Sequence, residues 1–124
     1  MKLDYTYLKK ILGFMEEAPT HQIWVSELLK NVSDGNEDKF VGHIKILFDF
    51  GCVSTQSGKT GFTTAMNGQN IIVDVPYRLT AKGYEFLDVL KNDTILNKIK
   101  DFAISNAWEI GKQMLISFAT NKFS

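Results

Sequence analysis

One segment, residues 36–51, constrains the fold of this chain more than any other. Its apolar residues recur at the spacing that places them on one side of a helix: Phe40, Ile44 and Leu47. Asn36 is a good amino-terminal cap, and the two acids that follow it are favoured at the positive end of a helix. Gly51 lies where a left-handed carboxyl-terminal cap belongs. We therefore predict a helix here, followed by a strand at residues 52–55.

Upstream of this helix, the pattern predicts a helix, a short strand and a second helix. The first helix spans residues 4–17 and ends before Pro19, because the residue before a proline is disfavoured in the helical conformation. Its apolar face comprises Tyr5, Leu8, Ile11, Leu12 and Met15. The β-favouring run 23–25 predicts the strand, and Ser26 is the expected cap of the second helix.

Downstream, residues 56–70 have the glycine-rich, polar composition of a loop or hairpin tip. Residues 71–79 favour β-structure, and Pro76 implies an edge strand or a bend there. Thr80 is a natural cap for a fourth helix. The residues that this helix is expected to bury are Tyr84, Leu87 and Leu90.

Two more helices are predicted beyond the fourth. Asn92 and Asp93 cap a fifth helix. Its apolar face comprises Ile95, Ile99 and Phe102. A sixth helix follows Asn106, with Gly111 permitting close approach of a neighbour. Its apolar face comprises Ala107, Met114, Leu115 and Phe118, with Trp108 nearby.

Composition restricts the class of protein. A chain of 124 residues with 44% hydrophobic residues can build one core without disulfides, so we expect a single domain over residues 1–124. The formal net charge is zero, and any contact with nucleic acid must therefore come from a local patch. A lone cysteine, no secretion signal and no apolar run long enough for a membrane span predict a cytoplasmic protein with no membrane partner.

The order of predicted elements is that of a winged helix, in which the third helix usually contacts DNA. Residues 43–53 are similar to the recognition-helix pattern of ArsR-type repressors, and residues 79–83 resemble the junction that joins the wing to the next helix in many bacterial winged helices. We predict an α+β winged helix-turn-helix, with three helices, a small β-hairpin wing and additional carboxyl-terminal helices. The core covers 1–91 and the helical extension 92–124.

Several segments together resemble one bacterial family over most of the chain. They are residues 1–5, 43–45, 78–80, 83–88 and 92–94. Their sequences and spacing are similar to the domain-of-unknown-function family 2513, which implies a bacterial or prophage origin and no particular ligand. Family members often carry histidine and tryptophan around the fourth and fifth helices. This chain has Tyr84 and Leu96 there, so those positions carry no inferred function.

On the third helix, the expected outward face offers two lysines for DNA contact, Lys39 and Lys45, with His43 at its border. Asp38 and Asp49 would repel phosphate on the same helix. The alternative, which the mixed charge favours, is that both lysines are solvated and the histidine is a half-buried packing residue.

In the wing, Lys59 and Thr60 are candidates for phosphate contact, because an ammonium and hydroxyls suit that sequence-independent interaction. Arg78 could reach DNA from the base of the wing. The alternatives are that the loop is simply polar and that the arginine pairs with a nearby carboxylate, which its neighbours favour.

Catalysis is not expected. His21, His43 and Cys52 lack the spacing of metal ligands, and Cys52 is better explained as a buried small apolar residue than as a nucleophile. Residues 58–60 resemble the end of a phosphate-binding loop, but Val53 occupies the position of the required leading glycine. No catalytic residue, metal, cofactor or small-molecule ligand is indicated.

The resulting hypothesis is a non-enzymatic, DNA-binding regulator of a mobile element, contacting duplex DNA through the third helix and the wing. The alternative is a protein-interaction or dimerisation module that uses the same scaffold without binding DNA. The two carboxyl-terminal helices exceed what a minimal winged helix needs, and such appended helices commonly form a homodimer. The alternative is that they fold back on the domain. Ile46 and Phe50 also fit an apolar contact better than a phosphate contact.

Overall fold

The computed structural model describes residues 1–97, which form helices and short antiparallel strands. In chain order the elements are α1 (Tyr5–Glu16), β1 (Ile23–Trp24), α2 (Val25–Val32), α3 (Glu37–Asp49), β2 (Val53–Thr55), β3 (Phe62–Thr64), β4 (Asn70–Ile72), β5 (Pro76–Leu79) and α4 (Ala81–Lys91). A further helical segment covers 93–97. The expected α+β class is confirmed. The rest of the predicted fifth helix, including Ile99 and Phe102, and the whole sixth helix lie outside the described residues.

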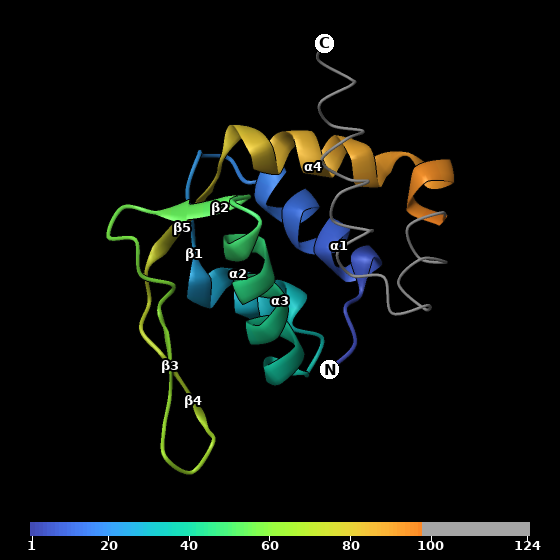
Figure 1. The fold of residues 1–124 in the computed structure, drawn as a ribbon. Helices are drawn as coiled ribbons and strands as arrows, with labels where there is room; N and C mark the ends of the chain where they lie inside the picture. The colour runs from blue at the N-terminus through green and yellow to red at the C-terminus, as the bar shows by residue number, and fades with distance from the viewer. Residues whose placement is uncertain (98–124) are drawn as a thin grey trace.

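The strands form two small sheets (Figure 1). In the three-stranded sheet the order is β1-β5-β2, and both pairings are antiparallel. Of the two alternatives for Pro76, the edge strand is wrong, because β5 is the central strand. The predicted β-run 71–79 is interrupted before Pro76, between β4 and β5. Pro76 is the first residue of β5, a position where a missing N–H is tolerated, and it lies opposite Trp24.

The second sheet is a hairpin. Its strand β3 lies in the predicted loop or hairpin tip 56–70, and β4 extends from Asn70 into the predicted β-run 71–79. Strands β3 and β4 pair antiparallel, and the hairpin projects from the rest of the molecule beside α3 (Figure 1). Gly61 at its base and Gly68 at its turn have positive φ angles of 82° and 85°, which favour glycine. We refer to residues 61–73 as the hairpin, and to the helices with the three-stranded sheet as the body.

The body encloses the hydrophobic core. The predicted apolar faces of α1 and α3 are buried as expected, including Leu8, Ile11, Phe40, Ile44 and Leu47, which are all 0% exposed. On α4, Leu87 and Leu90 are buried, but the predicted burial of Tyr84 is wrong, since its side chain is 46% exposed. The buried face of α4 is centred on Gly83, Phe86, Leu87 and Leu90, one position away from Tyr84.

Three caps form as the sequence predicts. The side chains of Asn36, Thr80 and Asn92 accept hydrogen bonds from backbone amides three residues later, at 3.1, 3.0 and 3.1 Å. Gly51 ends α3 with a φ of 75°, as expected of a left-handed cap. The ends of the main helices are therefore encoded locally.

The predicted cap at Ser26 is wrong. Helix α2 begins at Val25, two residues before the start that a cap at Ser26 implies, and the cap position is Trp24, which has no side-chain cap bond. The backbone N–H of Ser26 instead donates to Asp74 Oδ1 at 2.9 Å, and its hydroxyl donates to Asp74 Oδ2 at 2.7 Å. A carboxylate 48 residues away thus satisfies the start of α2.

None of the helices within residues 1–97 combines the length and apolar character that crossing a membrane requires.

Candidate nucleic-acid interface

The hairpin is attached to the side of α3 by aromatic contacts. The ring of Phe62 in β3 packs edge-on against Phe40 in α3, with ring centroids 6.1 Å apart. Phe48, one residue from the end of α3, packs in the same manner on Tyr77 of β5 at 5.3 Å. The hydroxyl of Tyr77 donates a hydrogen bond to the carbonyl of Thr60, at the base of the hairpin. These contacts place the base of the hairpin next to α3.

Two of the predicted lysines are exposed on these elements. Lys45 lies on α3, and Lys59 lies in the turn between β2 and β3. Thr60 is half-buried, and its hydroxyl oxygen accepts a hydrogen bond from the amide of Phe62 at 3.4 Å. The Thr60 side chain therefore supports the turn, while the two ammonium groups remain available to a ligand.

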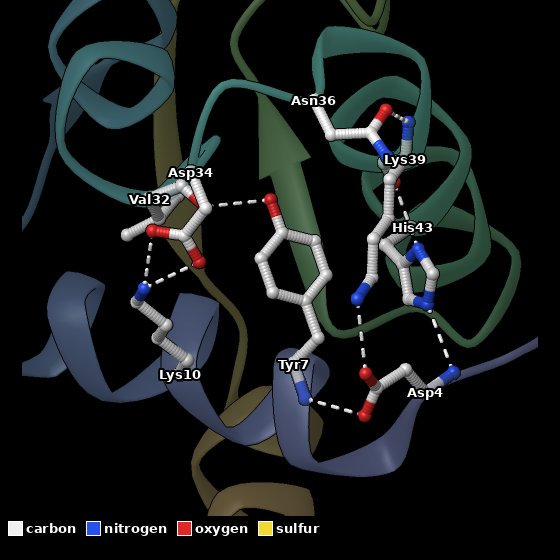
Figure 2. Close-up of polar contacts among 8 residues, drawn as sticks. All are labelled: Asp4, Tyr7, Lys10, Val32, Asp34, Asn36, Lys39 and His43. Atoms are coloured by element: carbon white, nitrogen blue, oxygen red, sulfur yellow. Dashed lines mark hydrogen bonds and ion pairs between the residues drawn. The ribbon is translucent and has the colours of Figure 1, made fainter.

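Lys39 is engaged within the protein (Figure 2). Its Nζ lies 3.0 Å from Asp4 Oδ2 and 4.8 Å from the centroid of the Tyr7 ring. Both partners come from the start of α1, so the lysine connects α3 to that helix. Because the ion pair is partly exposed, its contribution to stability is small, but it directs the ammonium group toward α1.

His43 does not lie on the surface at all, and its assignment as a DNA contact is corrected. The side chain is 0% exposed, with the ring edge-on to Tyr7 at 5.0 Å. Its Nε2 accepts a hydrogen bond from the N–H of Asp4 at 2.9 Å, and its Nδ1 lies 2.8 Å from the carbonyl of Lys39. The first bond requires an unprotonated Nε2, so we assign the proton to Nδ1, which donates to the carbonyl.

Burial lowers the pKa of His43, and the ammonium of Lys39 acts in the same direction. The hydrogen bond to the Lys39 carbonyl and the charge of Asp4 oppose this shift without reversing it. The imidazole is therefore a neutral internal connector. The packing interpretation of this residue is favoured, and its burial is more complete than the sequence suggested.

The sequence pattern does not indicate the polar cluster around His43. Asp4 caps α1 by accepting from the amide of Tyr7 at 3.1 Å. Burial raises the pKa of Asp4, but hydrogen bonds from Lys39 and the Tyr7 amide outweigh it and leave the pKa below its usual value. The Tyr7 hydroxyl donates to the carbonyl of Val32 at 2.6 Å, and burial raises its pKa to about 12 (Figure 2). An aspartate just before a helical pattern indicates the cap at Asp4, but no local pattern indicates that His43 bonds to this residue.

Arg78 lies on the sheet face turned away from α3. Side chains alternate along a strand, and Tyr77 and Leu79 on either side of it are buried while Arg78 is exposed. The prediction that Arg78 pairs with a nearby carboxylate is wrong for the described part of the chain. The ion pairs there are Lys10–Asp34, Lys39–Asp4 and Lys91–Glu16. The arginine therefore does not share a surface with Lys45.

The apolar residues proposed for a protein contact on α3 are also placed differently from expectation. Phe50 is buried, 4% exposed, and its ring lies 5.3 Å from that of Phe86 in α4. Ile46 is partly buried and packs against the core. Neither provides an exposed apolar surface. The hairpin does, because Met66, Ile71 and Val73 are 108%, 48% and 61% exposed.

Cys52 is buried, as predicted, and burial raises the pKa of its thiol to about 12. Within residues 1–97, no three His, Cys, Asp or Glu side chains are grouped as metal ligands would be.

Together these features define a small α+β protein that presents one helix and one projecting hairpin on a common side. The chain belongs to the family described as hypothetical protein (DUF2513), whose model matches residues 2–109. This confirms the resemblance inferred from the sequence. No curated protein and no solved structure matches the chain.

Proposed function

We propose that this protein is a winged helix that binds duplex DNA, with α3 in the major groove and the hairpin beside it on the sugar-phosphate backbone. The observation that carries the proposal is the attachment of the hairpin to α3 through Phe62 and Phe40. It gives the helix and the hairpin a defined relative position, which a two-part DNA contact requires. A regulatory role in a bacterial or prophage setting is part of the same proposal.

The contacts that we propose are made by Lys45 and Lys59, whose ammonium groups are exposed on α3 and at the base of the hairpin. Lys39 and His43 take no part, because one pairs with Asp4 and the other is buried. Glu37 and Asp38 at the exposed start of α3 oppose close approach of phosphate. We therefore expect modest affinity that depends strongly on salt.

The experiment is a titration of the full chain with random-sequence duplex over a series of salt concentrations. Lys45→Glu and Lys59→Glu should each weaken binding and reduce the magnitude of the salt slope by about 1, as expected for one lost phosphate contact. Lys82→Glu is the matched control, because Lys82 is exposed on α4 and not on α3 or the hairpin. Absence of duplex binding at low salt would refute the proposal.

The exposed apolar side chains of the hairpin favour a second candidate function, self-association through this element. The partner in that case is a second copy of the chain. Light scattering at rising concentration should then show a dimer that Met66→Ser with Ile71→Ser disrupts. The predicted dimer through the carboxyl-terminal helices is tested in parallel by deleting residues 106–124. A strict monomer in all samples rejects both.

A further inference from the structure

A hollow of about 370 Å³ lies beside the three-stranded sheet, in a volume range that suits a small ligand. Its lining consists of His21, Gln22, Ser54, Thr55, Gln56, Pro76 and Arg78. All of these except the proline carry polar groups that can donate hydrogen bonds, and none is a carboxylate. The lining therefore suits an anion.

Arg78 is the strongest donor in this hollow. It is exposed on the central strand β5, with Ser54 of β2 directly opposite it in the antiparallel register. Within residues 1–97 it has no carboxylate at ion-pair distance, and its Nη1 reaches the carbonyl of Leu79 only at 3.4 Å. The remaining guanidinium donors are free to bind two oxygens of one phosphate, the geometry at which arginine excels.

A second feature lies next to the hollow. Trp24 of β1 is 51% exposed, although tryptophan is large and apolar. In the antiparallel register its Cα partner is Pro76, which lies two residues before Arg78 in β5. Side chains two residues apart on a strand project from the same face. Trp24 lines a neighbouring hollow of about 310 Å³ that shares Gln22 with the first.

The charges around these two hollows separate their roles. Glu17 and Glu27 line the hollow at Trp24, so an anionic group is disfavoured there, whereas an uncharged planar ring can stack on the exposed indole. The hollow at Arg78 contains a cationic side chain and no carboxylate, so it favours an anionic group. We propose that this face of the sheet binds a nucleotide, with its phosphate on Arg78 and Ser54 and its base on Trp24.

Arg78 projects from the sheet face opposite the one on which Tyr77 meets Phe48, so it lies away from the proposed duplex contact of α3. The lining reaches the turn that carries Lys59, because the hydroxyl of Thr55 donates to the Lys59 carbonyl at 2.9 Å. The phosphate and base can come from a free nucleotide or from single-stranded nucleic acid. Both present the same two groups, an unpaired base and its phosphate. Duplex DNA buries its bases in the stack and does not fit the indole.

The test is a nuclear magnetic resonance titration of the full chain with adenosine monophosphate, inorganic phosphate and a short single-stranded oligonucleotide, at constant ionic strength. Saturable shifts should centre on residues 54–56, Arg78 and Trp24. Arg78→Gln should weaken binding of the nucleotide and of phosphate by about tenfold or more. Trp24→Ala should weaken the nucleotide by about fivefold or more and leave phosphate unchanged. Lys82→Gln is the control for a lost surface charge.

Stronger binding of the oligonucleotide than of the mononucleotide identifies single strands as the source, and the reverse identifies a free nucleotide. Ser54→Ala provides a second variant if Arg78→Gln does not fold. The proposal is overturned if the nucleotide gives no saturable shift, or if Arg78→Gln binds phosphate as well as the unaltered chain. Arg78→Gln and Trp24→Ala should bind duplex DNA as the unaltered chain does. Failure of the nucleotide site can therefore be distinguished from failure of the proposed function.

Discussion

The body and the hairpin are stabilised in different ways. In the body, side chains from four helices and three strands bury one another, and residues such as Leu12 and Leu47 are 0% exposed. The hairpin is too small to have a core of its own, and Met66 at its turn is fully exposed. It is held at its base, by Phe62 on α3 and by Tyr77 on Thr60. The body therefore needs its apolar residues for stability, whereas Met66, Ile71 and Val73 of the hairpin are exposed and available for recognition.

Truncating an apolar residue should separate the two regions most clearly. Leu47→Ala in the body removes a fully buried side chain and should lower the free energy of unfolding by about 2–5 kcal/mol. Met66→Ala in the hairpin should change it by less than about 0.5 kcal/mol, because nothing covers that side chain. Urea unfolding of both variants measures the difference. Equal losses would mean that the hairpin is buried against something.

Adding a methyl group tests how closely the body is packed. A Cβ at Gly83 would overlap the backbone carbonyl of Cys52, because the first turn of α4 lies directly against this residue between α3 and β2. Gly83→Ala should therefore cost about 2–3 kcal/mol. At Gly13 in α1 a Cβ meets open space, and Gly13→Ala should gain about 0.5–1 kcal/mol from helix propensity. Thermal unfolding checks both signs, and a stabilised Gly83→Ala variant would contradict this close approach.

Acidification should weaken the body through His43. The fold lowers the pKa of this buried imidazole below its ordinary value of 6.5, so the unfolded chain binds the proton more readily. Its contribution to stability is complete above 6.5 and is lost as the pH falls through the lowered pKa. Unfolding measured against pH should show this loss in the unaltered chain and in the exposed-residue control His21→Gln. The same loss in His43→Gln would rule out this histidine as its cause.

The smallest expected effect concerns the connection between the two regions. Tyr77→Phe removes the hydroxyl that donates to Thr60 and should cost about 1 kcal/mol. Amide hydrogen exchange should rise at the base of the hairpin, around residues 60–62, more than in α1. Tyr84→Phe is the control, because the side chain of Tyr84 is largely exposed. Unchanged exchange in Tyr77→Phe would show that the aromatic contacts alone hold the hairpin.

The candidate interface was predictable only in part. Lys45 and Lys59 are exposed as a polar helix face and a polar loop suggest. Lys39 and His43 lie on the same helix, yet both are bound to Asp4, 35 and 39 residues earlier in the chain. Helical spacing says on which side a residue lies, but not which other segment will cover that side.

The sequence by itself determined the α+β class, the order of the main elements and most helix ends, because apolar spacing and caps act over a few residues. Asn36, Gly51 and Thr80 illustrate this. Only the tertiary structure decided that Pro76 begins a central strand, that Asp74 serves the start of α2 and that His43 is buried beneath the start of α1. Each depends on which distant segment lies opposite, and that follows from how the whole core packs.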